Sequence, residues 1–419
     1  MPGVKYFLKS LLRRKWFLAI VLGQISLSVA VMSNTSSLIW QNLEILRRPT
    51  GVAEMGLVVI EQQFRDDGGI SGDWRKLNDQ LEASRREDVR MLRGMTNVKS
   101  VSVISTLPLF NRGVSFSQIG TRPDQRKGLA YTSVDYGDQD TVKTLGLSLI
   151  SGRNFIQGEV QHVKIYDTPS PSVTIISEHL SRRLFGEKSA VGRSVYLGGE
   201  SRPVEVVGVV KDLAGSSTGG WVSKFAEDTL LLPAISNRYK TIYAVRVADP
   251  HEGIFKEIVM SSLMGLNSTR LLDLSDIRDY SQIVSDARRS NRGTLYAMIA
   301  LVAALIVVVG GGIWGISRSL VAERQKTFAI HRALGATKRM LMLSVLLEGF
   351  VLAVIGIAIG AVLSEVLSGF LLTHFEVEHL PSVFVFGAVI EVLLVNQFAI
   401  LLPSVEASRV APAKLLRES

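Results

Sequence analysis

The feature that most constrains the fold is a run of 24 residues without a charge, Gly293–Ile316. At ~1.5 Å per residue in a helix, such a run covers the ~30 Å hydrocarbon core of a bilayer, so it predicts a membrane-spanning helix. Three further apolar runs, Trp16–Met32, Met340–Leu372 and Pro381–Leu402, extend this pattern. Met340–Leu372 is longer than a span needs, so we expect it to tilt or to project beyond the bilayer. The chain is therefore predicted to cross a membrane four times.

The first run begins like a signal peptide, because basic residues precede it. However, no convincing small-residue cleavage site follows it, and the apolar pattern continues at helical spacing through Ile39, Leu43 and Leu46. We expect an uncleaved anchor that continues outward as a stalk.

Lys and Arg near the ends of the spans predict the orientation, because they favour the cytoplasmic side. The first 15 residues carry five basic residues and no acid, and the segment 318–339 carries six basic residues against one acid. The loop Thr373–Leu380 has no Lys or Arg, whereas the tail has Arg409, Lys414 and Arg417. We therefore predict both termini inside the cell and residues 33–292 outside it.

Composition agrees with this map. Much of the net charge of +9 lies in the cytoplasmic segments, so nucleic-acid binding is not expected. The chain has no cysteine, which an exported domain tolerates well in an oxidising compartment.

The external region reads as strands and helices with a repeated order. Gly56–Ile60, Trp74–Met95 and Val98–Leu107 predict a strand, a helix and a strand, and Thr241–Val247, Gly253–Leu263 and Thr269–Leu272 predict the same order again. We expect these two units to pair in one α+β domain. The sequence between them behaves as a β-rich insertion, and Ser275–Arg292 has the helical spacing of a second stalk.

The predicted fold class is thus an α+β multi-domain membrane protein, in which four transmembrane helices carry a large external α+β domain inserted between the first and the second. The predicted divisions are a cytoplasmic N-terminus (1–15), helix 1 and stalk (16–46), a porter-like α+β domain (47–109 and 229–274), an inserted subdomain (110–228), stalk and helix 2 (275–317), a cytoplasmic segment (318–339), helix 3 (340–372), helix 4 (381–403) and a cytoplasmic tail (404–419).

Several stretches together resemble the MacB-type, FtsX-like (type VII) ABC transporter permeases. They are Ser151–Phe155, Ser172–Val195 and Val204–Leu213 in the external region, Glu323–Thr337 in the cytoplasmic segment, and Pro403, Ala407, Pro412, Leu415 and Arg417 in the tail. The resemblance covers nearly the whole chain in the right order. It implies an inner-membrane permease that works as a homo- or heterodimer on a separate cytoplasmic ABC ATPase, which binds the ATP and Mg²⁺. It also implies a periplasmic adaptor and a TolC-like outer-membrane channel.

The resemblance further implies that the cytoplasmic segment contacts the ATPase and transmits its movement. The contact residues carried over are Glu323, Arg324, Ala329, Ile330, Arg332, Ala333, Leu334, Gly335 and Ala336. The residues themselves fit this role, because Phe328, Ala329, Ala333 and Ala336 form a small apolar helix face, and the arginines suit acidic partners. An amphipathic helix lying on anionic lipid is the alternative reading.

Other motifs are assigned by their position. The chain contains no GxxxxGK[ST] phosphate loop, so we expect no cofactor in it, and we find no catalytic or metal-binding constellation. Gly311, Gly315, Gly356 and Gly360 lie in spans and predict close helix packing. The intramembrane acids Glu348, Glu365 and Glu391 are functional candidates by default. For Glu348 and Glu391 we favour snorkelling or pairing with a neighbouring subunit over a proton relay.

We interpret the chain as the permease of an exporter that moves a peptide or small molecule from the periplasmic side by mechanotransmission. A lipoprotein-extraction permease and an FtsX-like activator of an external enzyme remain open as alternatives.

Overall fold

The computed structural model describes residues 15–64, 74–113, 115–123, 125, 130–165, 167–217, 220–249, 254–267, 270–375 and 380–408. The predicted basic segment before residue 15, the end of the tail after residue 408 and most of the loop after Thr373 lie outside these ranges. The chain divides into a helical unit, residues 1–46 and 291–419, and an α+β unit, residues 47–290.

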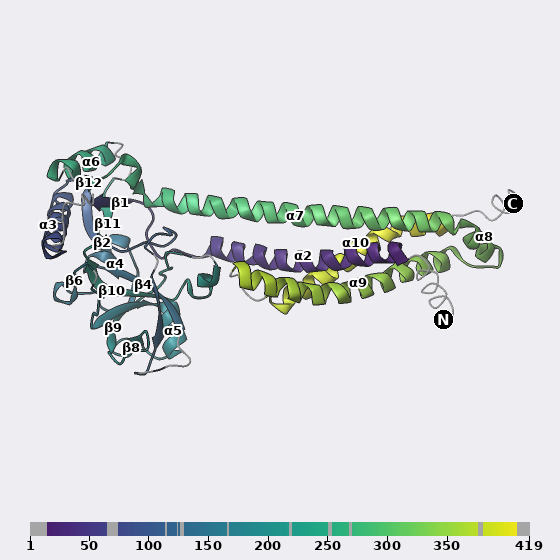
Figure 1. The fold of residues 1–419 in the computed structure, drawn as a ribbon, viewed down its shortest axis with the longest axis horizontal. Coiled ribbons are helices and arrows are strands. Elements are labelled where there is room, and N and C mark those ends of the chain that lie inside the picture. The colour runs from purple at the N-terminus through teal and green to yellow at the C-terminus, as the bar shows by residue number, and fades with distance from the viewer. Residues whose placement is uncertain are drawn as a thin grey trace. The chain divides into compact units, whose positions relative to one another are not determined.

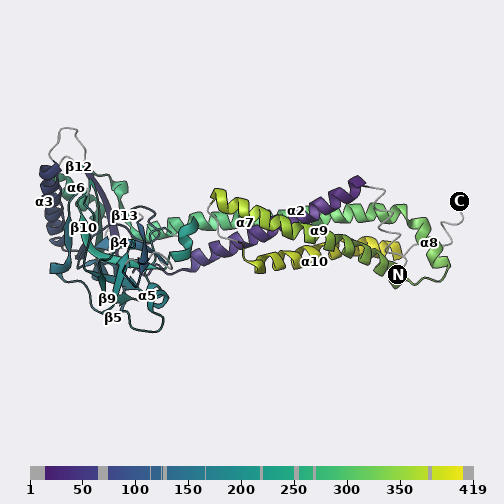
Figure 2. The ribbon, with the colours of Figure 1, turned by 60° about the horizontal axis from the view of Figure 1, so that its bottom comes forward.

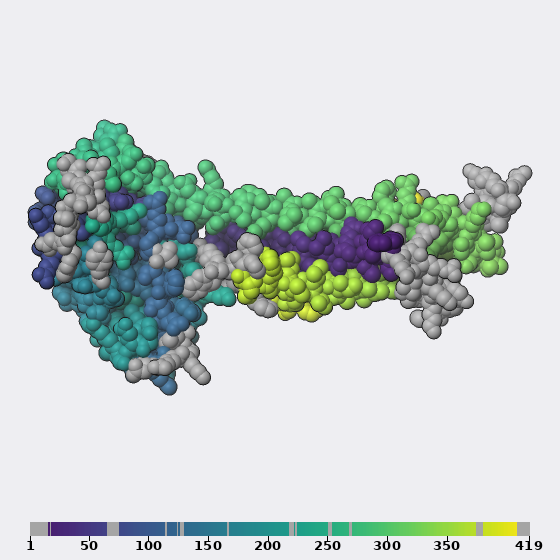
Figure 3. Space-filling view, in the orientation of Figure 1, coloured from purple at the N-terminus to yellow at the C-terminus, as the bar shows by residue number. Residues whose placement is uncertain are grey.

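The helical unit contains the predicted spans as long helices: α2 (Lys15–Arg47), α7 (Tyr280–Glu323), α9 (Lys338–Phe375) and α10 (Ser382–Ser408). All four are long and apolar enough to cross a membrane. Figure 1 shows them side by side, and on the face in Figure 3 α2 lies between α7 and the pair α9 and α10. Their shared core includes Ile25, Val309, Ile357 and Val392. The four predicted spans are confirmed by these helices.

A smaller, antiparallel sheet in the α+β unit joins the two strand–helix–strand repeats. Its order is β12-β1-β11-β2, and β13 also pairs with β1. The strands are β1 (Leu57–Phe64), β2 (Val98–Ile104), β11 (Lys240–Val247), β12 (Arg270–Leu271) and β13 (Ile277–Asp279), and the helices are α3 (Trp74–Arg93) and α6 (Phe255–Leu266). This strand order is that of a split βαβ, or ferredoxin-like, arrangement. The register places Val59 opposite Ala244 at the centre of the sheet.

A larger, mixed sheet has the order β4-β3-β8-β9-β7-β10-β6, with β5 on β9. Figure 2 labels β4, β5, β9 and β10 of this sheet. Its strands are β3 (Phe116–Gly120), β4 (Ala130–Gly137), β5 (Leu149–Gly152), β6 (Gln161–Val163), β7 (Val173–Ser177), β8 (Ser194–Leu197), β9 (Val204–Val210) and β10 (Thr229–Ser236), with the short helices α4 (Thr141–Leu145) and α5 (Glu178–Phe185). Short 3₁₀ helices lie at Gln157–Glu159 (η1), Gly220–Phe225 (η2) and Leu274–Asp276 (η3).

Two predicted boundaries need correction. We placed 229–274 in the porter-like domain, but β10 pairs with β4, β6 and β7 of the larger sheet, so the chain returns to the smaller sheet at Lys240. The second stalk was predicted from Ser275, but Ile277 lies in β13 and the helix begins at Tyr280.

The first residues of α7 are built into the core of the α+β unit. Tyr280, Ile283 and Val284 are buried in one cluster with apolar residues of both sheets. The Tyr280 hydroxyl donates a hydrogen bond of 2.9 Å to the carbonyl of Pro108. A fully buried tyrosine with a satisfied hydroxyl fixes the start of this helix firmly.

Candidate functional site

The segment predicted to carry function follows α7 directly. Arg324 interrupts the helix, α8 (Gln325–Ala333) follows, and α9 begins at Lys338. At the end of α8, Gly335 has φ +96°; its N–H donates to the carbonyl of Arg332, and that of Ala336 donates to His331. This is a Schellman cap, which needs a left-handed residue and therefore favours glycine. Gly335 thus has a local structural role in the turn between α8 and α9 (Figure 1).

The inner face of α8 packs within the chain. Phe328 is buried with Val321, Leu341 and Ala407, which come from α7, α9 and α10. Ala329 has no exposed surface. Phe328 and Ala329 were predicted on a face open to a partner, and this part of the prediction is wrong because the face is covered by the chain's own helices.

The outer face of α8 is exposed and partly apolar. Ile330 is 49% exposed and Leu334 is 80% exposed. They follow Lys326 at intervals of four residues, so all three lie on one side of the helix. Glu323, Ala333 and Gly335 are also exposed, whereas Arg332 and Ala336 are half-buried. Exposed leucine and isoleucine beside basic residues form a surface suited to a protein partner.

Two ionic or polar contacts tie the segment to the spans. The Arg324 guanidinium lies 2.8 Å from a carboxylate oxygen of Glu348 in α9, and the two side chains are 29% and 30% exposed. Arg332 donates a hydrogen bond of 3.4 Å to the carbonyl of Ser408 in α10. We predicted that Glu348 snorkels or pairs with a neighbouring subunit, and the structure instead gives it a partner within its own chain. Sequence reasoning missed this pair because its members are 24 residues apart, Arg324 between α7 and α8 and Glu348 within α9.

A small cavity lies beside this ion pair. Its volume is ≈ 50 Å³, and its walls include Arg324, Glu348, Asn396 and the apolar side chains of Ile313 and Ile400. The Asn396 amide donates a hydrogen bond of 3.3 Å to the carbonyl of Gly349. Such a volume has room for only a few water molecules.

The predicted packing glycines divide into two groups. A Cβ on Gly356 would lie 2.7 Å from the Ile25 side chain, and one on Gly360 would lie 2.8 Å from the Ser26 carbonyl oxygen, so α2 and α9 approach closely at both. At Gly311 and Gly315, the surrounding helix backbone aside, no atom of a described residue lies within 4 Å of such a Cβ. The close contact with α7 occurs instead at Gly312, against Gln24, which donates to the carbonyl of Val308 at 2.9 Å.

A buried polar contact between α2 and α9 escaped the sequence analysis. The hydroxyls of Ser33 and Ser364 are 2.5 Å apart, and the Asn34 amide donates to the Ser364 carbonyl at 3.2 Å. Interhelical hydrogen bonds of this type stabilise helix pairs in membranes.

The other two intramembrane acids differ from Glu348. Glu365 is exposed on α9 and Glu391 is half-buried on α10. Neither has an ion pair or a side-chain hydrogen bond within the described residues.

Comparison with known proteins decides the family. Residues 17–253, more than half of the chain, match the model of the MacB-like periplasmic core domain, and residues 298–412 match the C-terminal FtsX-like permease model. The chain belongs to the MacB-type, FtsX-like family of ABC transporter permeases. The four apolar helices and the periplasmic core domain fit an inner-membrane protein.

Individual relatives are distant. The chain is 26% identical to the macrolide export ATP-binding/permease protein MacB of Chromobacterium violaceum, over 57% of this chain and 37% of that protein. It is 24% identical to the uncharacterized ABC transporter permease YvrN of Bacillus subtilis, over 69% of this chain and 71% of YvrN. The crystal structure of the periplasmic region of MacB from Actinobacillus actinomycetemcomitans aligns with 58% of this chain and 97% of that region, with 14% identity and a TM-score of 0.35. The chain thus spans little more than a third of the length of the Chromobacterium violaceum MacB protein.

Proposed function

We propose that this MacB-type permease is the mechanotransmission subunit of an ABC exporter. ATP-driven movement of a cytoplasmic ABC ATPase displaces α8, and α7 carries the displacement to the periplasmic α+β unit. The cargo is a peptide or small molecule taken from the periplasmic side and passed to an adaptor and an outer-membrane channel. The proposal includes an orientation with both termini in the cytoplasm, which follows from the distribution of Lys and Arg.

The observation that carries this proposal is the continuity of α7. It is a single helix of 44 residues, Tyr280–Glu323, with a length of about 66 Å at ~1.5 Å per residue. Its first residues are buried in the core of the α+β unit, and its last turn adjoins the Arg324–Glu348 ion pair. A helix fixed at both ends supports transmission of a push or a rotation from one end to the other.

Two further features support the same reading. The cavity beside the ion pair has room for water but not for cargo, which favours a lever over a path through this part of the bundle. Glu365 exposes a carboxylate from a predicted span, and such a group is costly in lipid, which supports a second permease subunit against α9.

The test weakens α7 without touching either end. Ser290, Asn291 and Arg292 are replaced together by glycine in one variant and by alanine in its matched control. Glycine costs about 1 kcal/mol per position relative to alanine in a helix. The full chain is reconstituted with its ABC ATPase in nanodiscs, and amide hydrogen exchange in the α+β unit is compared without nucleotide and with the ATPase trapped by vanadate.

We expect trapping to change exchange in the α+β unit of the wild type and the alanine variant, and to change it far less in the glycine variant, whose ATPase still hydrolyses ATP. An equal response in the glycine variant and the wild type would refute transmission along α7. No response in any of the three would refute mechanotransmission to this unit altogether.

A further inference from the structure

A large, strongly basic pocket lies in the α+β unit. Its volume is ≈ 530 Å³, and it lies between α3 and residues of the larger sheet and of η1. Four arginines of α3 line it, namely Arg85, Arg86, Arg90 and Arg93, and His162 of β6 faces them. Arg86, Arg90 and Arg93 recur at intervals of four and three residues, which places them on one side of the helix, and Arg85 directly precedes Arg86.

Arg85 is the unusual member of this set, because it is a buried cation that forms no ion pair with a carboxylate of any residue that the structure describes. Its residue is only 3% exposed. Its guanidinium donates to the side-chain carbonyl of Asn237, and its second nitrogen lies 3.4 Å from Nδ1 of His162. Burial lowers the pKa of Arg85. The charges of Glu82 and Asp88 raise this pKa, but neither carboxylate is close enough to the guanidinium to form an ion pair. Buried charges in proteins are normally paired, so this guanidinium is poised for an anion.

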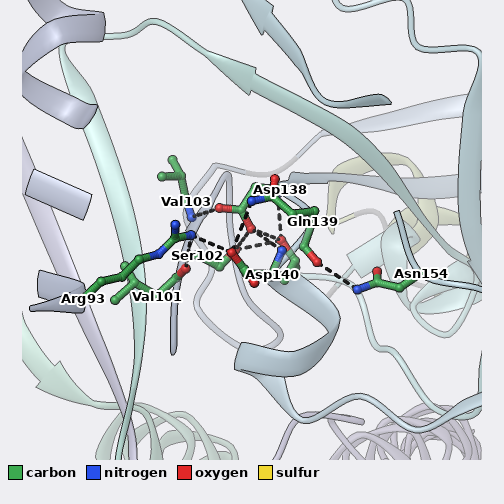
Figure 4. Close-up of polar contacts among 9 residues, drawn as sticks. Arg93, Val101, Ser102, Val103, Asp138, Gln139, Asp140 and Asn154 are labelled. Atoms are coloured by element: carbon green, nitrogen blue, oxygen red, sulfur yellow. Dashed lines mark hydrogen bonds and ion pairs between the residues drawn. The ribbon is translucent and has the colours of Figure 1, made fainter. Parts of the chain in front are cut away.

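Arg90 is the second arginine without a neutralising partner. It is exposed, and its side chain makes no hydrogen bond or ion pair with any other described residue. The remaining two arginines are held at the pocket's rim. Arg86 pairs with Glu82, while Arg93 lies 2.5 Å from Asp140 and donates to the carbonyl of Val101 at 3.3 Å (Figure 4).

The one acid that lines the pocket does not cancel the charge of Arg85 or Arg90. Asp138 is buried, and its carboxyl oxygens accept hydrogen bonds from the Ser102 hydroxyl at 2.7 Å, the Val103 N–H at 3.1 Å and the Asp140 N–H at 3.0 Å (Figure 4). Burial raises the pKa of Asp138, while these hydrogen bonds lower it. The side chain therefore serves to fix the loop that carries Asp140.

We propose that this pocket binds a small molecule through a carboxylate or phosphate group held between Arg85 and Arg90. Arginine presents a planar fork of donors that matches both groups. The pocket's volume falls within the roughly 300–1,000 Å³ that small-molecule sites occupy. This inference goes beyond the proposed transport function and does not rest on it, because binding requires neither the ATPase nor export.

Isothermal titration calorimetry on the full chain in nanodiscs tests the proposal. Citrate is the carboxylate probe and inorganic phosphate is the phosphate probe, both titrated at constant ionic strength set with sodium chloride. We expect saturable binding of at least one probe with a Kd of about 1 mM or tighter. Binding of one probe alone assigns the chemical class, and binding of both assigns an oxyanion site common to them.

The variants locate the site. Arg90→Gln is exposed and so leaves folding intact; we expect it to weaken binding about tenfold, the usual worth of one charge-assisted hydrogen bond. Arg85→Gln is expected to abolish binding, with hydrogen exchange of α3 confirming the fold. Lys76→Gln, an exposed basic residue of the same helix outside the pocket, is the control and should bind as the wild type does.

The proposal is overturned if neither probe binds below about 10 mM. It is also overturned if Arg90→Gln and Lys76→Gln bind equally well. Binding of polyglutamate without binding of either small probe would assign the surface to an acidic protein segment and would likewise refute the small-molecule site.

Discussion

Asp135 should make the stability of the α+β unit depend on pH near neutrality. This residue lies in β4 opposite Leu231 of β10, and it is buried, with one carboxyl oxygen that has no hydrogen-bond partner among the described residues. Desolvation raises its pKa from 3.8 to about 7. In the unfolded chain the carboxyl is ionised above pH ~4, whereas in the folded chain it keeps its proton until about pH 7.

The sign and size of the effect follow from linkage. The folded state holds the proton that the unfolded state releases, so the free energy of unfolding falls as the pH rises from 3.8 to about 7 and is level above that. The full difference of about three pH units, at about 1.36 kcal/mol per unit, is on the order of 4 kcal/mol. An experiment from pH 5 to pH 8.5 covers about two of these three pH units, those between pH 5 and the folded-state pKa of about 7. The free energy of unfolding should therefore fall by roughly 3 kcal/mol over this range.

The assay compares the wild type with Asp135→Asn, whose side chain has a similar shape but does not titrate. Hydrogen exchange of the β4 and β10 amides in the full chain, corrected for intrinsic rates, gives the free energy of opening at each pH. We expect the wild type to lose stability relative to the variant as the pH rises from 5 to 8.5. A difference between the two proteins that stays constant over this range would refute the buried, unpaired state of Asp135.

Three further predictions concern packing, buried charge and the exposed face of α8. Gly360→Ala should destabilise the helical unit by about 1–3 kcal/mol in thermal unfolding, because its Cβ meets α2, whereas Gly369→Ala, with open space around it, should not. Asp88 and Arg270 form a fully buried ion pair, so Asp88→Leu should cost about 3–5 kcal/mol, and adding Arg270→Met should restore much of that loss in chemical denaturation. Ile330→Asp should reduce co-purification of the ABC ATPase without lowering the thermal stability of the chain, and unchanged co-purification would mean that this face lies on lipid.

The spans and several strands of the smaller sheet were predictable because each is determined by its own residues. An uncharged run such as Gly293–Ile316 has only one stable environment, and the strand Thr241–Val247 was recognisable from its β-branched residues. The sheet to which β10 belongs was not predictable. Its residues 229–236 are buried almost throughout, so no polar face indicates which neighbours it takes, and its pairing with β4, β6 and β7 is settled only by the assembled sheet.

The candidate site shows the same limit at the level of side chains. Helical spacing predicted an apolar face on α8, but it could not tell that Ala329 is covered by neighbouring helices while Leu334 is exposed. The partner of Glu348 depends on how α8 and α9 meet, which no local pattern contains. Likewise, Gly312 rather than Gly311 contacts Gln24, because the rotation of α7 about its axis follows from packing with α2.

The most direct test of mechanotransmission is an exchange of the charges at the Arg324–Glu348 pair. Arg324→Glu, Glu348→Arg and the double variant are each reconstituted with the ABC ATPase, and both ATP hydrolysis and the vanadate-dependent change in hydrogen exchange of the α+β unit are measured. The account predicts that each single variant hydrolyses ATP without the response in the α+β unit, and that the double variant recovers it because the ion pair is restored with reversed polarity. Single variants that respond as fully as the wild type, or a double variant that responds no better than the singles, would contradict a coupling role for this pair.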